Sequence, residues 1–148
     1  MLIYLDMCCL NRPFDDQSQA RIRLETEAKL FLQQYVREGR LALAWSYVLD
    51  YENSINPFVD RRESIGSWRS MAQIRVTETQ DIIAKGKELV LLGIKPFDAL
   101  HVASALAAGV NIFVSTDDSL LRKLSNISEI QAMLPGDALA QVENEHED

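Results

Sequence analysis

The sequence predicts an α/β protein with a mostly parallel central sheet and helices on both faces of that sheet. Short apolar runs that suit buried strands alternate with segments whose apolar residues recur every three or four positions. Acidic residues follow two of the apolar runs within two positions. In a parallel sheet these acids would lie at the carboxyl edge, where such folds place their working site.

Five short apolar runs bounded by polar residues are predicted to be strands. They cover residues 2–5, 41–45, 74–76, 112–115 and 130–133. The run at 74–76 is short enough to be a link instead of a strand. Between the first strand and the first helix, residues 11–17 are rich in turn formers and are predicted to form a loop.

Helices are predicted where apolar positions follow the helical period. They cover residues 18–38, 46–56, 61–71, 77–92, 96–108 and 118–124. Ser46 suits an N-cap and Pro96 suits a first helical turn. Gly39, Gly93 and Gly109 are predicted to end the helices that precede them.

The chain of 148 residues is one ordinary domain, expected to cover residues 1–140. The remaining acidic residues, 141–148, are expected to form a frayed, disordered tail. No apolar run is long enough to span a membrane. The opening segment, Met1–Asp6, has neither a basic leader nor a cleavage site, so we expect a cytoplasmic protein.

The net charge of −7 argues against nonspecific binding to nucleic acid, which needs a basic surface. A bound metal or a basic partner protein would offset part of this charge. The two cysteines, Cys8 and Cys9, are adjacent, which suits neither a structural disulfide nor a zinc site. We interpret them as small apolar residues that fill space beside a loop.

Four acids occupy positions that an α/β fold would bring together: Asp6, Glu52, Asp98 and Asp117. Each has an ordinary alternative role, such as a helix cap or a solvated side chain. Gathered at one point they would repel one another unless a cation offsets their charge. A hard divalent ion is the expected cation, and a phosphate the expected substrate.

Metal chemistry also fits the scarcity of other catalytic groups. The chain has only two histidines, His101 and His146, and no convincing Ser-His-Asp set. A divalent ion held by two to four carboxylates lowers the pKa of water and shields phosphate charge, which suffices for attack on a phosphodiester.

These segments, in this order, resemble the PIN-domain nucleases, in particular the VapC-like toxins. The resemblance covers nearly the whole chain, and its ordered set is more specific than any single piece. Five segments are similar. They are the first strand with its acid (2–6), a serine followed by an acid six residues later (46–52), the helix that carries the third acid (96–105), the strand end that carries the fourth acid (114–118), and a closing strand and turn (133–137).

The resemblance implies a three-layer α/β/α PIN-like fold and endonucleolytic cleavage of RNA with Mg²⁺ or Mn²⁺ as cofactor. Asp6, Glu52, Asp98 and Asp117 carry over as the catalytic, metal-binding set, and Ser115 as a residue that orients a carboxylate. The resemblance also implies a homodimer and a cognate antitoxin protein, as in a type II toxin–antitoxin pair.

Several assignments stay open in the sequence. Asp50 competes with Glu52 for the second acid, although the spacing from Ser46 favours Glu52. Asp118 either assists Asp117 or only decorates a helix start. Asn11 and Arg12 either bind phosphate or form a turn with a solvated arginine. We interpret His101 as a packed polar residue near the site rather than a metal ligand.

Two other functions compete with the nuclease. One is a receiver-like signalling domain that binds Mg²⁺ and accepts phosphate. Such a site requires an acid pair at the end of the first strand and a lysine after the last strand, whereas here Asp6 stands alone and no suitable lysine follows a late strand. The other is a catalytically weak PIN-like protein that acts by binding RNA.

Overall fold

A computed structural model describes residues 1–147 of the chain, without the side chains of 146 and 147. Within it, five strands form one sheet in the order β3-β2-β1-β4-β5, and every neighbouring pair is parallel. The strands are β1 (Leu2–Leu5), β2 (Ala42–Ser46), β3 (Ile74–Val76), β4 (Ile112–Val114) and β5 (Ala132–Met133). The predicted parallel sheet is therefore confirmed, including the short run at 74–76.

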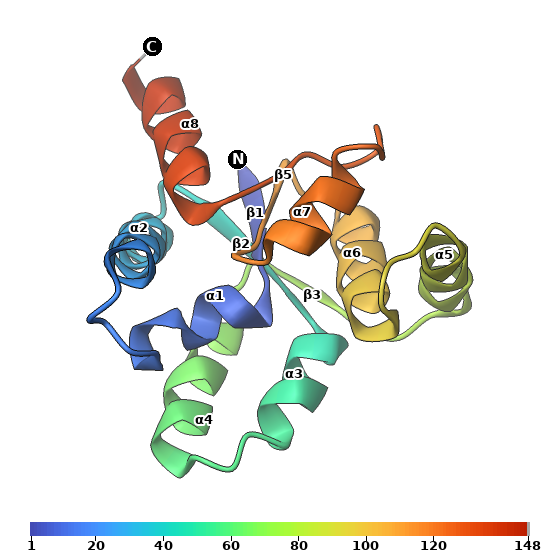
Figure 1. Cartoon of the computed structure of the whole chain (residues 1–148), viewed down its shortest axis with the longest axis horizontal. Coiled ribbons are helices and arrows are strands. Elements are labelled where there is room, and N and C mark those ends of the chain that lie inside the picture. Colours follow the sequence, from blue (N-terminus) through green and yellow to red (C-terminus); the bar gives the residue numbers. More distant parts are fainter. Residues whose placement is uncertain (148) are drawn as a thin grey trace.

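Helices cover both faces of this sheet, as the sequence predicts. Figure 1 shows α2 and α8 on one side and α5 and α6 on the other, which gives three layers. The α-helices are α1 (Met7–Asn11), α2 (Ala20–Arg37), α3 (Tyr47–Ser54), α4 (Val59–Gly66), α5 (Gln80–Leu91), α6 (Pro96–Ala108), α7 (Asp118–Leu124) and α8 (Pro135–Glu147). Two short 3-10 helices, η1 (Arg12–Phe14) and η2 (Ser67–Met71), complete the described elements.

The core lies on both faces of the two central strands, β1 and β4. Ile3, Tyr4, Ile112 and Phe113 are fully buried, as expected of parallel strands covered on both sides. Within residues 1–147, no helix combines the length and the apolar character that crossing a membrane requires.

The helix ends follow the predicted signals. The Ser46 hydroxyl oxygen accepts a hydrogen bond from the Leu49 backbone N–H at 3.2 Å, so it caps α3 as expected. Gly109 ends α6 with a φ of 74°, a left-handed conformation that glycine adopts without the cost of a Cβ clash.

Three segments differ from the sequence prediction. Residues 7–11, most of which carried no prediction, form α1, and residues 12–14, expected to belong to the loop at 11–17, form η1. The helix expected at 61–71 begins earlier, at Val59, and changes to a 3-10 helix after Gly66. The closing strand is shorter than predicted, and Pro135 begins a helix rather than a turn.

The expected disordered tail is the fourth difference. Residues 141–147 continue α8, while Asp148 lies outside the described residues. Ala138 and Val142 are both buried, at 0% and 1% exposure. They lie four residues apart, on one face of the helix, so their packing holds the start of this segment against the domain, whereas residues 143–145 are exposed.

Candidate active site at the carboxyl edge of the sheet

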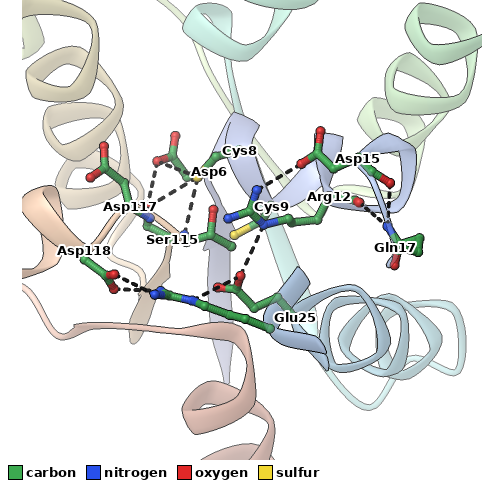
Figure 2. Close-up of polar contacts among 12 residues, drawn as sticks. Asp6, Cys8, Cys9, Arg12, Asp15, Gln17, Glu25, Ser115, Asp117 and Asp118 are labelled. Atoms are coloured by element: carbon green, nitrogen blue, oxygen red, sulfur yellow. Dashed lines mark hydrogen bonds and ion pairs between the residues drawn. The ribbon is translucent and has the colours of Figure 1, made fainter. Parts of the chain in front are cut away.

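Three elements meet where the two central strands end. Asp6 follows β1 directly, and its Oδ2 accepts a hydrogen bond from the Ser115 hydroxyl at 3.0 Å (Figure 2). The same hydroxyl oxygen accepts the backbone N–H of Asp117 at 3.1 Å. Asp6 is buried and Asp117 half-buried. The two acids predicted at neighbouring strand ends are therefore joined through Ser115.

Asp98 joins this group from the first turn of α6. Burial and the charges of Asp6 and Asp117 raise the pKa of the Asp98 carboxyl above its ordinary value, and Glu52 adds a smaller effect in the same direction. A carboxyl whose pKa is raised by other carboxylates lies in their common field. Asp98 therefore lies within electrostatic range of the other three acids predicted from the sequence.

Glu52 projects from α3 and is tied to the site by a histidine. His101 is buried, and its Nε2 lies 2.6 Å from Glu52 Oε1 and 3.9 Å from Asp6 Oδ1. Burial lowers the pKa of His101, but the hydrogen bond to Glu52 and the charge of Asp6 outweigh it and raise the net pKa. His101 is therefore a packed polar residue beside the site, as the sequence analysis interprets it.

The histidine is held in turn by a buried tyrosine. Tyr4 Oη lies 2.5 Å from His101 Nδ1 and 2.6 Å from Ser46 Oγ. Because a carboxylate only accepts hydrogen bonds, His101 donates from Nε2 to Glu52. Its Nδ1 accepts from the Tyr4 hydroxyl when the ring is neutral and donates to the Tyr4 oxygen when the ring is protonated. Burial raises the pKa of Tyr4 well above its ordinary value, which keeps its hydroxyl proton available.

Two nearby acids lie outside this group. Asp50 accepts a hydrogen bond from Trp45 Nε1 at 2.7 Å and pairs with Arg69, so Glu52 is the second acid at this edge. Asp118 is exposed, and its two carboxylate oxygens accept hydrogen bonds from Nη1 and Nη2 of Arg21 at 2.7 and 2.8 Å (Figure 2). Asp118 therefore lies at the start of α7 without belonging to the acidic group, and its contact with Arg21 joins α7 to α2.

The segment after Asp6 is partly engaged in its own contacts. Arg12 pairs with Asp15 at 3.0 Å and with Glu25 at 3.2 Å, so in this structure its charge is already compensated (Figure 2). Asn11 lines a cavity of about 350 Å³ together with Glu52. Of the two candidates for a phosphate contact, only Asn11 faces space beside an acid of the site.

Two residues at this edge were not predicted from the sequence. Cys8 is half-buried, with its Sγ 3.5 Å from Asp6 Oδ2 and 3.4 Å from Ser115 Oγ, whereas Cys9 is buried filler as expected. Tyr4 is the other, and here a signal existed. It lies two residues before Asp6, so the two side chains share one face of the strand.

A divalent ion fits the chemistry of this group, which offers carboxylate oxygens. No lysine or arginine of the described residues pairs with any of the four acids. In the same part of the chain, however, no three His, Cys, Asp or Glu side chains converge closely enough to hold a metal. The acids are neighbours that share an electrostatic field, without forming a preformed cage.

The fold and the site define a parallel α/β protein with an acidic centre at the carboxyl edge of its sheet. Its strand order differs from the order 2-1-3-4-5 of receiver-like folds, which removes the structural basis of that alternative. No family model and no curated protein matches the chain. Solved structures do match it, and they show that the fold is PIN-like.

Three of these structures illustrate the likeness. A chain of VapBC2 from Rickettsia felis, bound to a DNA fragment from the promoter, has 14% identity and a TM-score of 0.56 over 90% of this chain and 98% of that one. PAE2754 from Pyrobaculum aerophilum has 15% identity and a TM-score of 0.56, with coverage of 97% and 96%. DNA-bound VapBC from Salmonella typhimurium has 17% identity and a TM-score of 0.52, with coverage of 91% and 99%.

Proposed function

We propose that this chain is a metal-dependent endoribonuclease whose acidic centre consists of Asp6, Glu52, Asp98 and Asp117. The observation that carries the proposal is the position of these acids at the carboxyl edge of the sheet, where Ser115 joins Asp6 to Asp117 and His101 lies between Asp6 and Glu52. The pKa of Asp98 is raised by burial and by the charges of the other three acids, against a lowering effect of His101, and no lysine or arginine of the described residues pairs with any of these acids. A divalent cation would relieve this repulsion, and Mg²⁺ or Mn²⁺ suits ligands that are all oxygen.

Each of the four acids has a role that follows from its position in the fold. Asp6 is oriented by Ser115 and Glu52 by His101, so both carboxylates are held before a substrate arrives. Asp98 and Asp117 complete the oxygen donors from α6 and the start of α7. When bound, a divalent ion would lower the pKa of water and shield the phosphate charge. Hydrolysis of the RNA backbone would leave a 5′-phosphate and a 3′-hydroxyl.

The sequence resemblance to VapC-like toxins and the fold shared with VapBC chains support a role as the toxin of a type II toxin–antitoxin pair. On this proposal a cognate antitoxin protein blocks the site, and the toxin is a cytoplasmic homodimer. Expression of the wild-type chain should arrest growth, and Asp98→Asn should abolish the arrest. Growth arrest that persists in Asp98→Asn would count against a catalytic toxin.

The direct test is cleavage of RNA by the purified chain with Mg²⁺, with Mn²⁺ and with a chelator. We expect cleavage only with metal, and we expect Asp6→Asn and Asp98→Asn to reduce the rate at least about a hundredfold, the scale on which such chemistry is lost. Asp118→Asn is the matched control, because it neutralises an adjacent acid that pairs with Arg21 away from the centre.

Each result bears on a different part of the proposal. Cleavage by the wild type that the chelator does not reduce would remove the metal requirement. Wild-type rates in both Asp6→Asn and Asp98→Asn would remove the acidic centre. A chain that binds RNA but never cleaves it would favour the catalytically weak, binding-only alternative.

A further inference from the structure

Beside the acidic centre lies a second group of side chains that the proposed chemistry does not use. Arg61, on α4, lies over two aromatic rings: its guanidinium carbon is 4.3 Å from the Phe58 ring centroid and 5.4 Å from that of Phe14. Arg61 also donates from Nη2 to the Phe14 carbonyl oxygen at 3.3 Å. We call Phe14, Phe58 and Arg61 the aromatic–arginine platform.

The platform is continuous with the acidic centre. Phe58 and Arg61 line the cavity of about 350 Å³ that Glu52 and Asn11 also line. Glu52 belongs to the acidic centre through His101, so one cavity joins the platform to this centre. Figure 1 shows α1, α3 and α4, which carry these residues or precede them, gathered at one end of the sheet.

Two properties of the platform suit a nucleobase. Phe58 is 55% exposed although it is a large apolar residue, which leaves aromatic surface for stacking. Arg61 pairs with no carboxylate of the described residues, whereas Arg12, Arg21 and Arg69 each do. A planar, uncompensated guanidinium binds phosphate and also stacks on flat rings.

The net charge of −7 favours a contact of this kind in an RNA-cleaving chain. Attraction to phosphates is weak for an acidic protein, so affinity has to come from contacts that do not depend on overall charge. Stacking on an aromatic side chain is such a contact, and it needs an unstacked base. Bases inside a duplex are not available for it.

We propose that the aromatic–arginine platform binds a nucleobase of single-stranded RNA next to the phosphodiester that is cleaved. This inference rests on the proposed ribonuclease function and deepens it by assigning a base-binding subsite to the platform. Phe58 supplies the stacking surface, Arg61 contacts the adjoining phosphate, and Asn11 offers an amide to the edge of the base.

The test measures binding separately from cleavage. The probe is a short single-stranded oligoribonucleotide that contains 2-aminopurine, bound by the full chain with Ca²⁺ in place of Mg²⁺. We expect fluorescence quenching on binding. Phe58→Ala and Arg61→Lys should each weaken affinity about 5- to 100-fold, the range found for losing one base–aromatic contact. Affinity for a duplex of the same sequence should not respond to Phe58→Ala.

The chain offers matched controls. Phe31 on α2 is 57% exposed, so Phe31→Ala removes a comparable ring elsewhere. Arg40 lies 4.5 Å from the Tyr35 ring centroid just before β2, at the opposite edge of the sheet, so Arg40→Lys removes a comparable guanidinium–ring contact. Both controls should bind the probe within about twofold of wild type, well below the loss expected for one stacked base.

The outcomes separate this inference from the proposed function. Phe58→Ala and Arg61→Lys that bind like the two controls, or a wild type that does not quench the probe, would overturn the platform even if cleavage is confirmed. A weakened antitoxin complex with unchanged RNA affinity would make the platform a protein interface and likewise overturn it. Quenching that depends on Phe58 in a chain without nuclease activity would uphold the platform alone. In an active enzyme, Phe58→Ala should raise KM far more than it lowers kcat.

Discussion

Ser115 joins Asp6 to Asp117: its hydroxyl donates to Asp6 Oδ2 at 3.0 Å, and its oxygen accepts the Asp117 backbone N–H at 3.1 Å. The two acids follow different strands, more than a hundred positions apart in the sequence. One fully buried hydroxyl therefore fixes both the direction of the Asp6 carboxylate and the place of the chain that carries Asp117.

We predict that Ser115→Ala lowers the free energy of unfolding by about 1–3 kcal/mol, because it leaves a buried carboxylate with one hydrogen bond fewer. If the acidic centre binds metal, Mn²⁺ affinity should fall about 10- to 100-fold, as expected when a residue that orients a ligand is removed. Urea unfolding and Mn²⁺ titration by calorimetry measure the two effects.

Ser104→Ala is the control for this prediction. Ser104 is also fully buried, but its hydroxyl has no hydrogen-bond partner among the described residues. Its removal should leave stability unchanged or slightly higher, and Mn²⁺ affinity unchanged. Equal effects of the two substitutions would show that the contacts of Ser115 carry no special weight.

The second prediction concerns the Tyr4 hydroxyl. In Tyr4→Phe, His101 Nδ1 and Ser46 Oγ both lose a partner inside the core, so we expect a loss of about 1–3 kcal/mol in unfolding free energy. Tyr47→Phe is the matched control, because the buried Tyr47 hydroxyl has no partner among the described residues and its loss should be nearly neutral. Comparable losses in the two variants would contradict the assigned chain of hydrogen bonds.

Repulsion within the acidic centre gives a third prediction, about metal and stability. The raised pKa of Asp98 means that ionising this carboxyl in the folded state is unfavourable, so stability is lost as the pH rises through that pKa. At pH 7 without metal, Asp98→Asn should therefore melt at a higher temperature than wild type. Differential scanning fluorimetry in a chelator checks this.

The same repulsion predicts that Mg²⁺ or Mn²⁺ raises the Tm of the wild type. Binding at a hundredfold excess over Kd stabilises by about 2.7 kcal/mol. The shift should disappear in Asp98→Asn and persist in Asp118→Asn. If millimolar Mg²⁺, Mn²⁺ and Ca²⁺ all leave the wild-type Tm unchanged, the metal site has no support and the binding-only function gains it.

Local patterns in the sequence were enough to place Asp6 and Asp117, because both follow apolar strands and the carboxyl ends of parallel strands share an edge. The choice of Glu52 over Asp50 rested instead on the resemblance to the PIN-domain segment in which an acid follows a serine by six residues. Patterns of this range carry no information on partners that are distant in the chain. The pairing of Asp118 with Arg21, and the bond between His101 and Tyr4, each span 97 positions.

The acidic run after residue 142 suggests a solvated tail, and residues 143–145 are exposed as expected, but the chain there is helical. Ala138 and Val142, which precede this run, have the four-residue spacing of a buried helix face. Burial of that face against the domain outweighs the helix-neutral, charged residues around it. The short helix α1 was missed because its residues, Met7–Asn11, lack a repeating apolar pattern long enough to detect.

Lys29 on α2 supports the last prediction, which concerns pH. Its side chain is buried, and no carboxylate of the described residues lies within ion-pairing distance. Burial lowers the pKa of Lys29 to about 8 from an ordinary 10.5. Between these two pH values the unfolded chain binds a proton that the folded chain does not, so stability rises with pH across this window.

Replacing Lys29 by methionine removes this cost and keeps the apolar part of the side chain. Since one pKa unit corresponds to about 1.4 kcal/mol, we expect Lys29→Met to stabilise the fold by about 1–3 kcal/mol at pH 7. The gain should shrink as the pH approaches 10. Urea unfolding at pH 7 and pH 10 measures the difference between variant and wild type, in which the titration of shared tyrosines and cysteines cancels.

Lys87→Met, at an exposed position on α5, should show neither the gain nor its pH dependence. A Lys29→Met variant that is less stable than wild type at pH 7 would mean that the buried ammonium has a stabilising partner.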